Sequence, residues 1–225
     1  MLINDIHSSE WGASLSEKLV TPASEEAVRQ GKVLLYTNHV PKRLYMKILI
    51  EGYNRLTVEK YASSLALQFK KEFTIQTDNS TSIYKCMPAT PAMEETGFNT
   101  MQYMTIETEC IEYEEETSIT SSSTSFNINA DGNIEAPCTI ELLPSKDIAK
   151  VMLTGLSSDP IYLNDLKAGK LLIVNGEEGE VEEAGVSSYE KFDGWEFPKI
   201  QAGVNLIQLN EEGITITVRY KARWN

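Results

Sequence analysis

The strongest constraint on the fold is an alternation of apolar and polar residues that recurs in the C-terminal part of the chain. Apolar side chains occupy every second position from 134 to 142 and again from 214 to 220. A period of two places these side chains on one face of a strand. Short apolar runs between the two segments are separated by Gly, Asn, Asp and Pro turns. This spacing of short strands predicts an all-β sandwich.

The N-terminal part adds one helix to a set of strands. Apolar residues alternate over 44–50, which predicts a strand. Over 57–72 the apolar spacing becomes helical, with one stripe made of Val58, Tyr61, Ala62, Leu65 and Phe69. Thr57 is expected to be the N-cap, and Lys70 and Lys71 suit the negative end of the helix dipole.

Three further strands are expected in this part, over 73–77, 82–87 and 101–113, with a turn at 78–81 between the first two. One helix among several strands indicates an α+β domain, a β-sandwich with one helix. The chain as a whole is therefore expected to be mainly β.

A change of composition predicts where the two domains separate. Eight of the thirteen residues in Thr117–Asn129 are Ser or Thr, and three glutamates precede them at 114–116. A segment of this composition buries little apolar surface, so it is interpreted as a linker. The expected domains are residues 1–116 and 130–225, with the linker at 117–129.

The charge balance excludes some functions. The chain has 20 Lys and Arg against 33 Asp and Glu, a formal net charge of −13. The excess of acid is present in both parts, so it disfavours a dedicated nucleic-acid binder, which needs a basic surface for phosphates. No run approaches the roughly 20 apolar residues that span a bilayer. The N-terminus also lacks the pattern of a secretory signal.

The scarce reactive residues form no recognisable motif. Cys86, Cys110 and Cys138 are odd in number and widely spaced, so they are expected to be small buried residues in a reducing cytosol. His7 and His39 stand 32 residues apart, outside any metal or nucleophile motif.

Acidic residues are plentiful, but they too indicate no site. The acidic run at 177–183 could supply a paired-carboxylate glycosidase or a calcium site. It lacks both a neighbouring aromatic wall and the spacing of a calcium loop, and a solvated hairpin is the favoured interpretation. No catalytic residue, metal ligand or cofactor site is predicted, and the chain is not expected to be an enzyme.

An aromatic cluster at 189–198 has two interpretations. Trp195, near Asp193 and Glu196, can stack on a sugar ring while the carboxylates bind its hydroxyl groups. Alternatively, Trp195 and Phe197 fill the sandwich core, and this is the favoured interpretation.

Several segments together resemble the distal tail protein (Dit) family of siphophages that infect Gram-positive bacteria. The most distinctive is Phe-Pro-Lys-Ile-Gln-Ala-Gly-Val-Asn-Leu-Ile at 197–207, followed by strand-like residues 214–220 and Lys-Ala-Arg-Trp at 221–224. Residues 132–141 and 161–176 resemble the start and the middle of the family's second domain. In the first domain the resemblance lies in the order of the elements, after an Ile-Asn-Asp-Ile start and Ser9–Gly12.

The resemblance implies a structural role in the virion, at the distal end of a tail assembled in the bacterial host cytoplasm. Distal tail proteins form a homo-hexameric ring whose N-terminal domains contact the tail-tube protein on one side. The other side meets the tail-associated lysin or the tail fibre base. The C-terminal domain, a galectin-like β-sandwich, often docks receptor-binding or other baseplate proteins. DNA passes through the ring without specific binding, there is no membrane partner, and no catalytic residues are carried over.

The net charge agrees with this role, because an acidic channel does not retain DNA. The expected subunit contacts are the polar segment 24–32, with Glu25 and Arg29, and the Pro88–Gly97 loop, with Met93. The alternative function is a carbohydrate-binding module that uses the Trp195 region for adhesion to the host surface. Galectins bind sugar through His-Asn-x-Arg, and residues 130–225 contain no histidine. The resemblance therefore concerns the fold of this domain more than its ligand.

Overall fold

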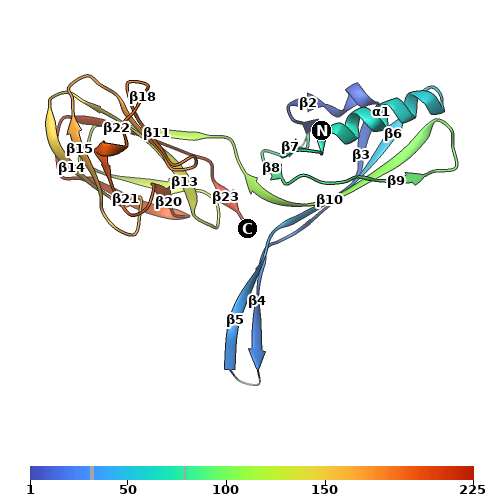
Figure 1. Ribbon diagram of the computed structural model, residues 1–225, viewed down its shortest axis with the longest axis horizontal. Helices are drawn as coiled ribbons and strands as arrows, with labels where there is room; N and C mark the ends of the chain where they lie inside the picture. Colours follow the sequence, from blue (N-terminus) through green and yellow to red (C-terminus); the bar gives the residue numbers. More distant parts are fainter. Residues whose placement is uncertain (31–32, 79) are drawn as a thin grey trace. The chain divides into compact units, whose positions relative to one another are not determined.

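The computed structural model describes the backbone of residues 1–30, 33–78 and 80–225, and the side chains of these residues other than 25–30 and 33–39. The chain forms two compact units, Met1–Tyr113 and Glu114–Trp224. Both are built mainly from antiparallel strands, and the α-helix of the described residues belongs to the first (Figure 1). The predicted mainly β class, with one helix in the N-terminal part, is confirmed.

The N-terminal unit is built on one sheet, in the order β2-β1-β7-β8-β10-β6-β3, with β9 also paired to β10. The predicted strands at 44–50, 73–77, 82–87 and 101–113 are all present. The bounds are β1 Leu2–Ile3, β2 Ile6–His7, β3 Ala13–Thr21, β6 Arg43–Glu51, β7 Phe73–Gln76, β8 Ile83–Cys86, β9 Ala92–Glu95 and β10 Met101–Tyr113, and a short 3-10 helix covers Ser8–Trp11.

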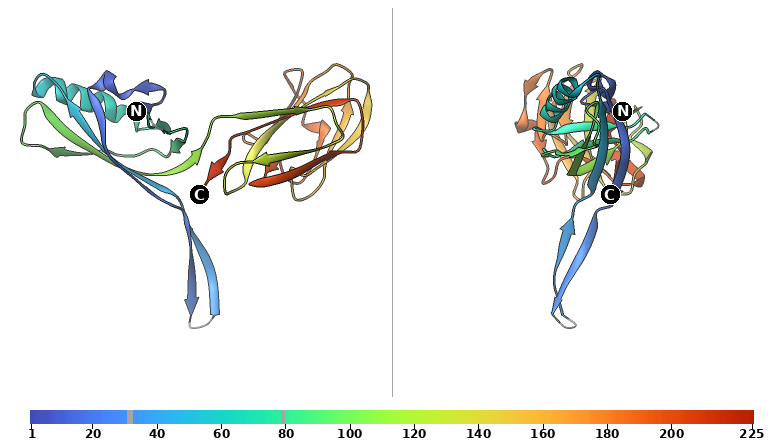
Figure 2. Two further views of the ribbon diagram at one scale, coloured as in Figure 1. Left: turned by 180° about the vertical axis from the view of Figure 1, so that it is seen from behind. Right: turned by 90° about the vertical axis from the view of Figure 1, so that its right-hand side faces the viewer.

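Helix α1 (Arg55–Gln68) lies against one face of this sheet (Figure 2). Its predicted stripe is confirmed, because Val58, Ala62, Leu65 and the capping Phe69 are buried in the core beneath it. Burying an aliphatic or aromatic side chain of this size contributes about 1.5–3 kcal/mol, so the stripe holds the helix in place. In the described part of the chain, no helix has the length and apolarity needed to cross a membrane.

Both ends of the helix differ from the prediction. The N-cap is Asn54, whose side chain accepts a hydrogen bond from the Thr57 backbone N–H at 2.9 Å. The helix therefore begins before Thr57, since a capping side chain satisfies an N–H two or three residues further on. It also ends at Gln68, so Lys70 and Lys71 lie beyond its last turn.

Strands β4 (Ser24–Gln30) and β5 (Val33–Val40) form a hairpin that continues from β3 and β6 as a separate two-stranded sheet (Figure 1). The β3–β6 ladder ends at the pair Thr21 and Arg43, and the β4–β5 ladder begins at Ser24 and Val40. Pro22 and Pro41 lie in the gap between the ladders. Since proline has no N–H to donate, the pairing is interrupted there.

The C-terminal unit is the predicted all-β sandwich. One sheet has the order β11-β22-β13-β16-β17-β18, with β20 also paired to β13, and the other has the order β12-β21-β14-β15-β19. Apolar side chains from both sheets form one core, in which Ile140, Val151, Leu163 and Val218 are fully buried. The bounds are β11 Thr117–Ser121, β12 Ser125–Ala130, β13 Ala136–Pro144, β14 Ile148–Thr154, β15 Ile161–Leu166, β16 Leu172–Asn175, β17 Glu180–Glu183, β18 Val186–Ser187, β19 Phe192–Asp193, β20 Lys199–Ile200, β21 Gly203–Leu209, β22 Ile214–Tyr220 and β23 Arg223–Trp224, with a 3-10 helix at Tyr189–Lys191.

The segment 117–129, expected to be a linker, differs from the prediction. It holds β11 and most of β12, which pair with β22 and β21 respectively, one in each sheet of the C-terminal unit. Its Ser and Thr side chains lie largely on the solvent side, and one of them, Thr120, meets the Thr217 hydroxyl of β22 across the strands at 2.9 Å. Thr is favoured in half-exposed edge strands. A segment rich in Ser and Thr can therefore form a paired strand, and its composition does not identify it as a linker.

Candidate assembly surface

The sheet of the N-terminal unit has a long edge at β3. Among the strands that the structure describes, β3 pairs with β6 alone. Its pairing shifts between Leu15 and Glu17 and is then regular as far as Thr21. Leu19 lies in this regular part with 58% of its surface exposed. An unpaired strand edge of this length is a template for a strand from another chain.

The sequence did not single out β3, and the bulge explains why. Leu15 and Val20 both pack toward the core, whereas Leu19 faces solvent. The extra residue between Leu15 and Glu17 moves the inward positions from odd to even numbers, which breaks the period of two that identifies a strand in sequence. β3 is identified by its register with β6, which is visible only in the structure.

The sheet face opposite α1 is acidic. Arg43, Lys47 and Lys85 on this face each have an acidic partner. Lys47 Nζ lies 2.7 Å from Glu94 Oε2, an Arg43 nitrogen lies 3.7 Å from Glu107 Oε1, and Lys85 Nζ lies 3.8 Å from Glu72 Oε2. The hydrogen bond to Glu94 raises the pKa of Lys47, whose ammonium also lies 4.5 Å from the centre of the Tyr103 ring. Three more exposed carboxylates share this face, those of Glu17, Glu51 and Glu109. The face is therefore net negative.

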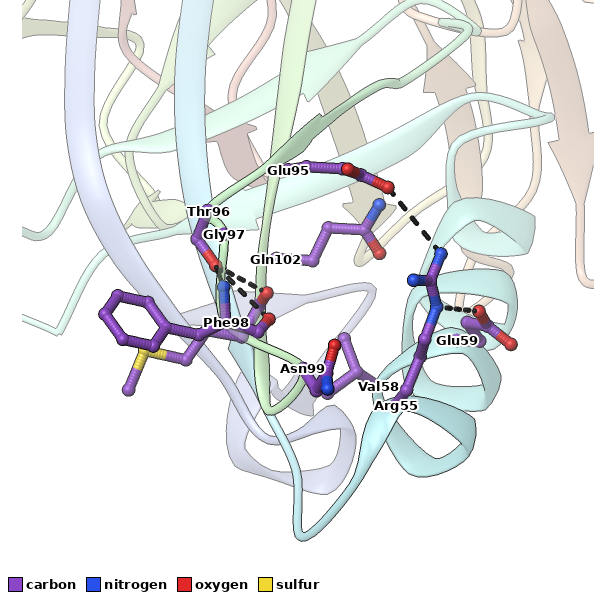
Figure 3. A pocket seen from close by; sticks show the side chains of 10 residues that line it. Arg55, Val58, Glu59, Glu95, Thr96, Gly97, Phe98, Asn99 and Gln102 are labelled. Atoms are coloured by element: carbon purple, nitrogen blue, oxygen red, sulfur yellow. Dashed lines mark hydrogen bonds and ion pairs between the residues drawn. The ribbon is translucent and has the colours of Figure 1, made fainter.

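A pocket of about 160 Å³ lies between the start of α1 and the turn from β9 to β10 (Figure 3). Arg55 from the helix reaches both Glu59, at 2.9 Å, and Glu95 of β9, at 3.6 Å. The Thr96 hydroxyl donates to the Met101 carbonyl at 2.8 Å and fixes the turn. Phe98 is another residue of the pocket lining, and its side chain is 70% exposed.

The pocket has the features of a structural junction. Both of its carboxylates bind Arg55, and these two contacts raise the pKa of the guanidinium, with the Glu59 hydrogen bond the largest cause. A carboxylic acid that donates protons near neutral pH needs burial against an apolar wall to raise its pKa. Neither carboxylate here has such an environment, because both are exposed. Within the described residues no group of three or more His, Cys, Asp or Glu side chains is placed to hold a metal ion.

In the C-terminal unit, the predicted packing of Trp195 in the core is wrong. Trp195 is 92% exposed, at the tip of a loop between Phe192 and Phe197. Those two rings stack on one another, with centroids 4.9 Å apart and planes 8° from parallel, and pack against the core. Gly194 lies so close to the Phe192 ring that a Cβ there would be 2.9 Å from it. The stacked pair occupies the site expected for Trp195 and leaves that side chain outside.

Asp193 and Glu196 are exposed on the same loop as Trp195. The structure thus places the three residues of the predicted sugar or partner contact together on one loop. Of the predicted subunit contacts, Met93 is 42% exposed on β9, opposite Met104. The Pro88–Gly97 segment is therefore partly a strand, where the sequence indicated a loop.

The other predicted contacts, Glu25 and Arg29, are on β4, and their side chains lie outside the described residues. All three cysteines are free and buried, as predicted.

Similar proteins are found by comparison of structures, not of sequences. No protein-family model matches the sequence, and no curated protein does. The Dit protein of phage SPP1, described as a paradigm of the hub adsorption apparatus in phages that infect Gram-positive bacteria, matches at a TM-score of 0.80 with 9% identity. The match covers 100% of this chain and 98% of the SPP1 chain.

A chain of the phage p2 baseplate in its activated conformation with Sr matches at a TM-score of 0.50 with 10% identity, over 95% of this chain and 92% of the other. The SPP1 match covers all of both units. The resemblance to distal tail proteins is thereby confirmed at the level of the fold, and the chain has the fold of the Dit hub protein of phage SPP1 over its whole 225 residues.

Proposed function

We propose that this chain is a structural subunit of a phage tail tip, a distal tail protein without enzymatic activity. Six copies form a ring that joins the tail tube to the tail-associated lysin or baseplate and surrounds the DNA channel. The N-terminal unit builds the ring, and the C-terminal sandwich is available to other baseplate proteins. The subunit is assembled in the bacterial host cytoplasm and resides at the distal end of the tail.

The open edge of β3 is the observation that carries this proposal. A soluble protein blunts a long edge with charges, prolines or a covering segment. The regular part of β3 carries Glu17 and Lys18, but it also presents the exposed Leu19 at its centre, and no described strand pairs with its outer edge. In a closed ring each subunit covers its neighbour's edge, so one kind of contact repeats until every edge is paired.

The hairpin of β4 and β5 supports the same conclusion. A two-stranded hairpin is marginally stable in water unless it packs against something else. Within the described strands β4 and β5 pair only with each other, and β5 begins with the apolar run Val-Leu-Leu-Tyr at 33–36. A neighbouring copy or the adjoining tail-tube ring supplies the missing surface.

The acidic sheet face opposite α1 suits the wall of a DNA channel. Arg43 and Lys47 are held by Glu107 and Glu94, so these two cations are not available to phosphates. The exposed carboxylates of Glu17, Glu51 and Glu109 around them repel the DNA backbone, which keeps passing DNA from binding. We infer that this face lines the channel.

Mass measurement by light scattering, on the full chain alone and with its tail-tube protein, tests the ring. Six chains of 25.2 kDa give a particle of about 151 kDa. Leu19→Lys is expected to abolish that particle, because a charge at an edge blocks strand addition. Leu206→Lys, which replaces a leucine 50% exposed on the C-terminal unit, is the matched control and is expected to assemble. Failure of the wild-type chain to assemble with its tail-tube protein would refute the proposal, and assembly of the Leu19 variant would refute the role of the edge.

The exposure of Trp195 favours a second function, adhesion to host-surface carbohydrate. An exposed indole beside two carboxylates offers a stacking surface and hydrogen-bond acceptors for a sugar ring. Titration of the full chain with cell-wall saccharides at millimolar concentration tests it. Tyr189, which is 51% exposed, provides the matched control. The adhesive function is supported if Trp195→Ala abolishes binding and Tyr189→Ala preserves it. Absence of saturable binding would exclude it.

A further inference from the structure

Two of the three cysteines, 24 positions apart in sequence, lie directly opposite one another in the N-terminal sheet. Cys86 of β8 is the register partner of Cys110 of β10. Both side chains face the core, with 1% and 7% of their surfaces exposed. Cys138 belongs to the other unit. The structure thus divides the three thiols into a pair and a single residue.

The hydrogen bonds around this pair show that Cys86 and Cys110 form a non-hydrogen-bonded cross-strand pair, the kind in which the two side chains lie closer together. The Met87 N–H donates to the Glu109 carbonyl at 2.9 Å, so positions 87 and 109 form a hydrogen-bonded pair, and the Cys110 N–H donates away from β8, to Lys42. Positions 86 and 110 are therefore a non-hydrogen-bonded pair, for which the Cα atoms lie about 4.5 Å apart. Disulfides join Cα atoms about 4.4–6.8 Å apart.

The surroundings activate one of the two thiols. The hydrogen bond between them lowers the pKa of Cys110 and raises that of Cys86. The ammonium groups of Lys42 and Lys18 lower the pKa of Cys110 further, against the opposing effects of burial and Glu112. Since the thiolate is the nucleophile in thiol oxidation, Cys110 is the attacking group of the pair.

We propose that Cys86 and Cys110 are the site of an intrachain disulfide, formed when the folded protein meets hydrogen peroxide. The Cys110 thiolate attacks one peroxide oxygen, the O–O bond breaks, and the protonated leaving oxygen departs as water, which leaves a sulfenic acid. The Cys86 sulfur then attacks the Cys110 sulfur and expels a second water. Two thiols are oxidised by two electrons and one peroxide is reduced to two waters.

The bond would close a loop that contains β9 and most of the pocket beside α1. The loop runs for 25 residues from Cys86 to Cys110. A cross-link over such a loop restricts the unfolded chain, so the oxidised N-terminal unit is expected to melt higher by roughly 10 °C or more. For a virion component, the change from the reducing cytosol to the medium outside the cell would supply the oxidising conditions.

The inference rests on the register of β8 and β10 and on the surroundings of the two thiols, so its test is independent of ring assembly. The full chain is treated with hydrogen peroxide, acid-quenched, unfolded and alkylated, and its free thiols are counted by mass. The wild-type count is expected to fall from three to one, with a linked Cys86–Cys110 peptide that is two hydrogen masses lighter than the sum of its parts. Cys138→Ala should fall from two to none, whereas Cys110→Ala should keep both.

Peptide mapping of the wild-type chain keeps the test informative even when a variant fails to fold. Three free thiols after oxidation, or a linkage that involves Cys138 or a second chain, would overturn the proposal. So would a Cys86–Cys110 linkage that forms only after the protein has been unfolded.

Discussion

Lys42 Nζ donates a hydrogen bond to Glu112 Oε2 at 2.6 Å, with only 5% and 17% of the two side chains exposed. The other carboxylate oxygen accepts from the Tyr84 hydroxyl at 3.1 Å. Burial raises the pKa of Glu112, but hydrogen bonds from Lys42, Ser82 and Tyr84 together outweigh it and leave that pKa lowered. The pair therefore fastens the base of the β4–β5 hairpin to the end of β10.

Removing the cation from this pair is expected to destabilise the N-terminal unit strongly. Lys42→Met leaves the Glu112 carboxylate without its charged partner, which costs about 3 kcal/mol of unfolding free energy. Urea unfolding at pH 7 measures the loss. Lys85→Met is the matched control in the same unit. Its ion pair with Glu72 spans 3.8 Å between half-exposed side chains, and such pairs contribute about 0.5 kcal/mol or less.

The loss at Lys42 should depend on pH. Because the pKa of Glu112 is lower in the folded protein than in the unfolded chain, its contribution is complete above the unfolded value, about 4.3. The contribution disappears as the pH falls through the lowered folded value. The difference between Lys42→Met and wild type is therefore expected to shrink as pH falls below 4. A difference that stays constant from pH 7 to pH 3 would contradict the role of this carboxylate.

The start of α1 gives a second prediction, at the residue that caps it. Asn54→Ala is expected to cost about 1 kcal/mol, because the Thr57 N–H loses its acceptor at the helix end. Thr57→Val removes only the 3.1 Å contact from the Thr57 hydroxyl to the same Asn54 oxygen, and a few tenths of a kcal/mol is expected. Thermal unfolding of the two variants ranks them, and an equal or larger loss at Thr57 would contradict the cap assignment.

This helix shows what could be predicted from the sequence and what could not. The buried stripe followed from the spacing of Val58, Ala62, Leu65 and Phe69, because periodicity depends only on local geometry. The cap did not, since Asn54 and Thr57 are both good capping residues and only the hydrogen bond distinguishes them. Pairwise contacts between distant residues were equally hidden. Lys191 donates to Glu183 at 2.6 Å, which buries one glutamate of a run expected to be solvated.

The candidate assembly surface also combines features that could be predicted from the sequence with features that could not. The Trp195 loop was located from its aromatic residues, but its exposure depends on the stacking of Phe192 on Phe197 and could not be deduced from composition. The β3 edge and the Cys86–Cys110 pair both arise from register, which is fixed by partners far away in sequence. The two-part fold could be predicted from the alternation of apolar residues and from the turn signals, which do not depend on partners far away in sequence.

A third prediction concerns two glycines of the C-terminal sandwich that both have positive φ. Gly155 has φ +94°, and a Cβ there would overlap the carbonyl oxygen of Leu206 in β21, whereas Gly169 has φ +72° and open space around it. Gly169→Ala is expected to cost about 1 kcal/mol for the backbone conformation alone. Gly155→Ala adds displacement of a strand and should cost at least about 2 kcal/mol more. Urea unfolding of the two variants gives the steric contribution by difference, and equal losses would contradict the close approach of residue 155 to β21.

The stability of the Phe192–Phe197 loop can be separated from any role in binding. Trp195→Ala should change the unfolding free energy by less than about 0.5 kcal/mol, because an exposed side chain has few contacts to lose. Phe197→Ala should cost about 2 kcal/mol, since it removes a stacked ring packed on the core.

Urea unfolding followed by circular dichroism measures both changes without relying on tryptophan emission. Acrylamide quenching of the wild-type chain and of Trp195→Ala checks the exposure directly, because the variant should lose the most accessible part of the emission. A stability loss at Trp195 as large as that at Phe197 would mean that the indole is packed in the core after all. The loop would then have no exposed ring to offer a sugar or a baseplate partner.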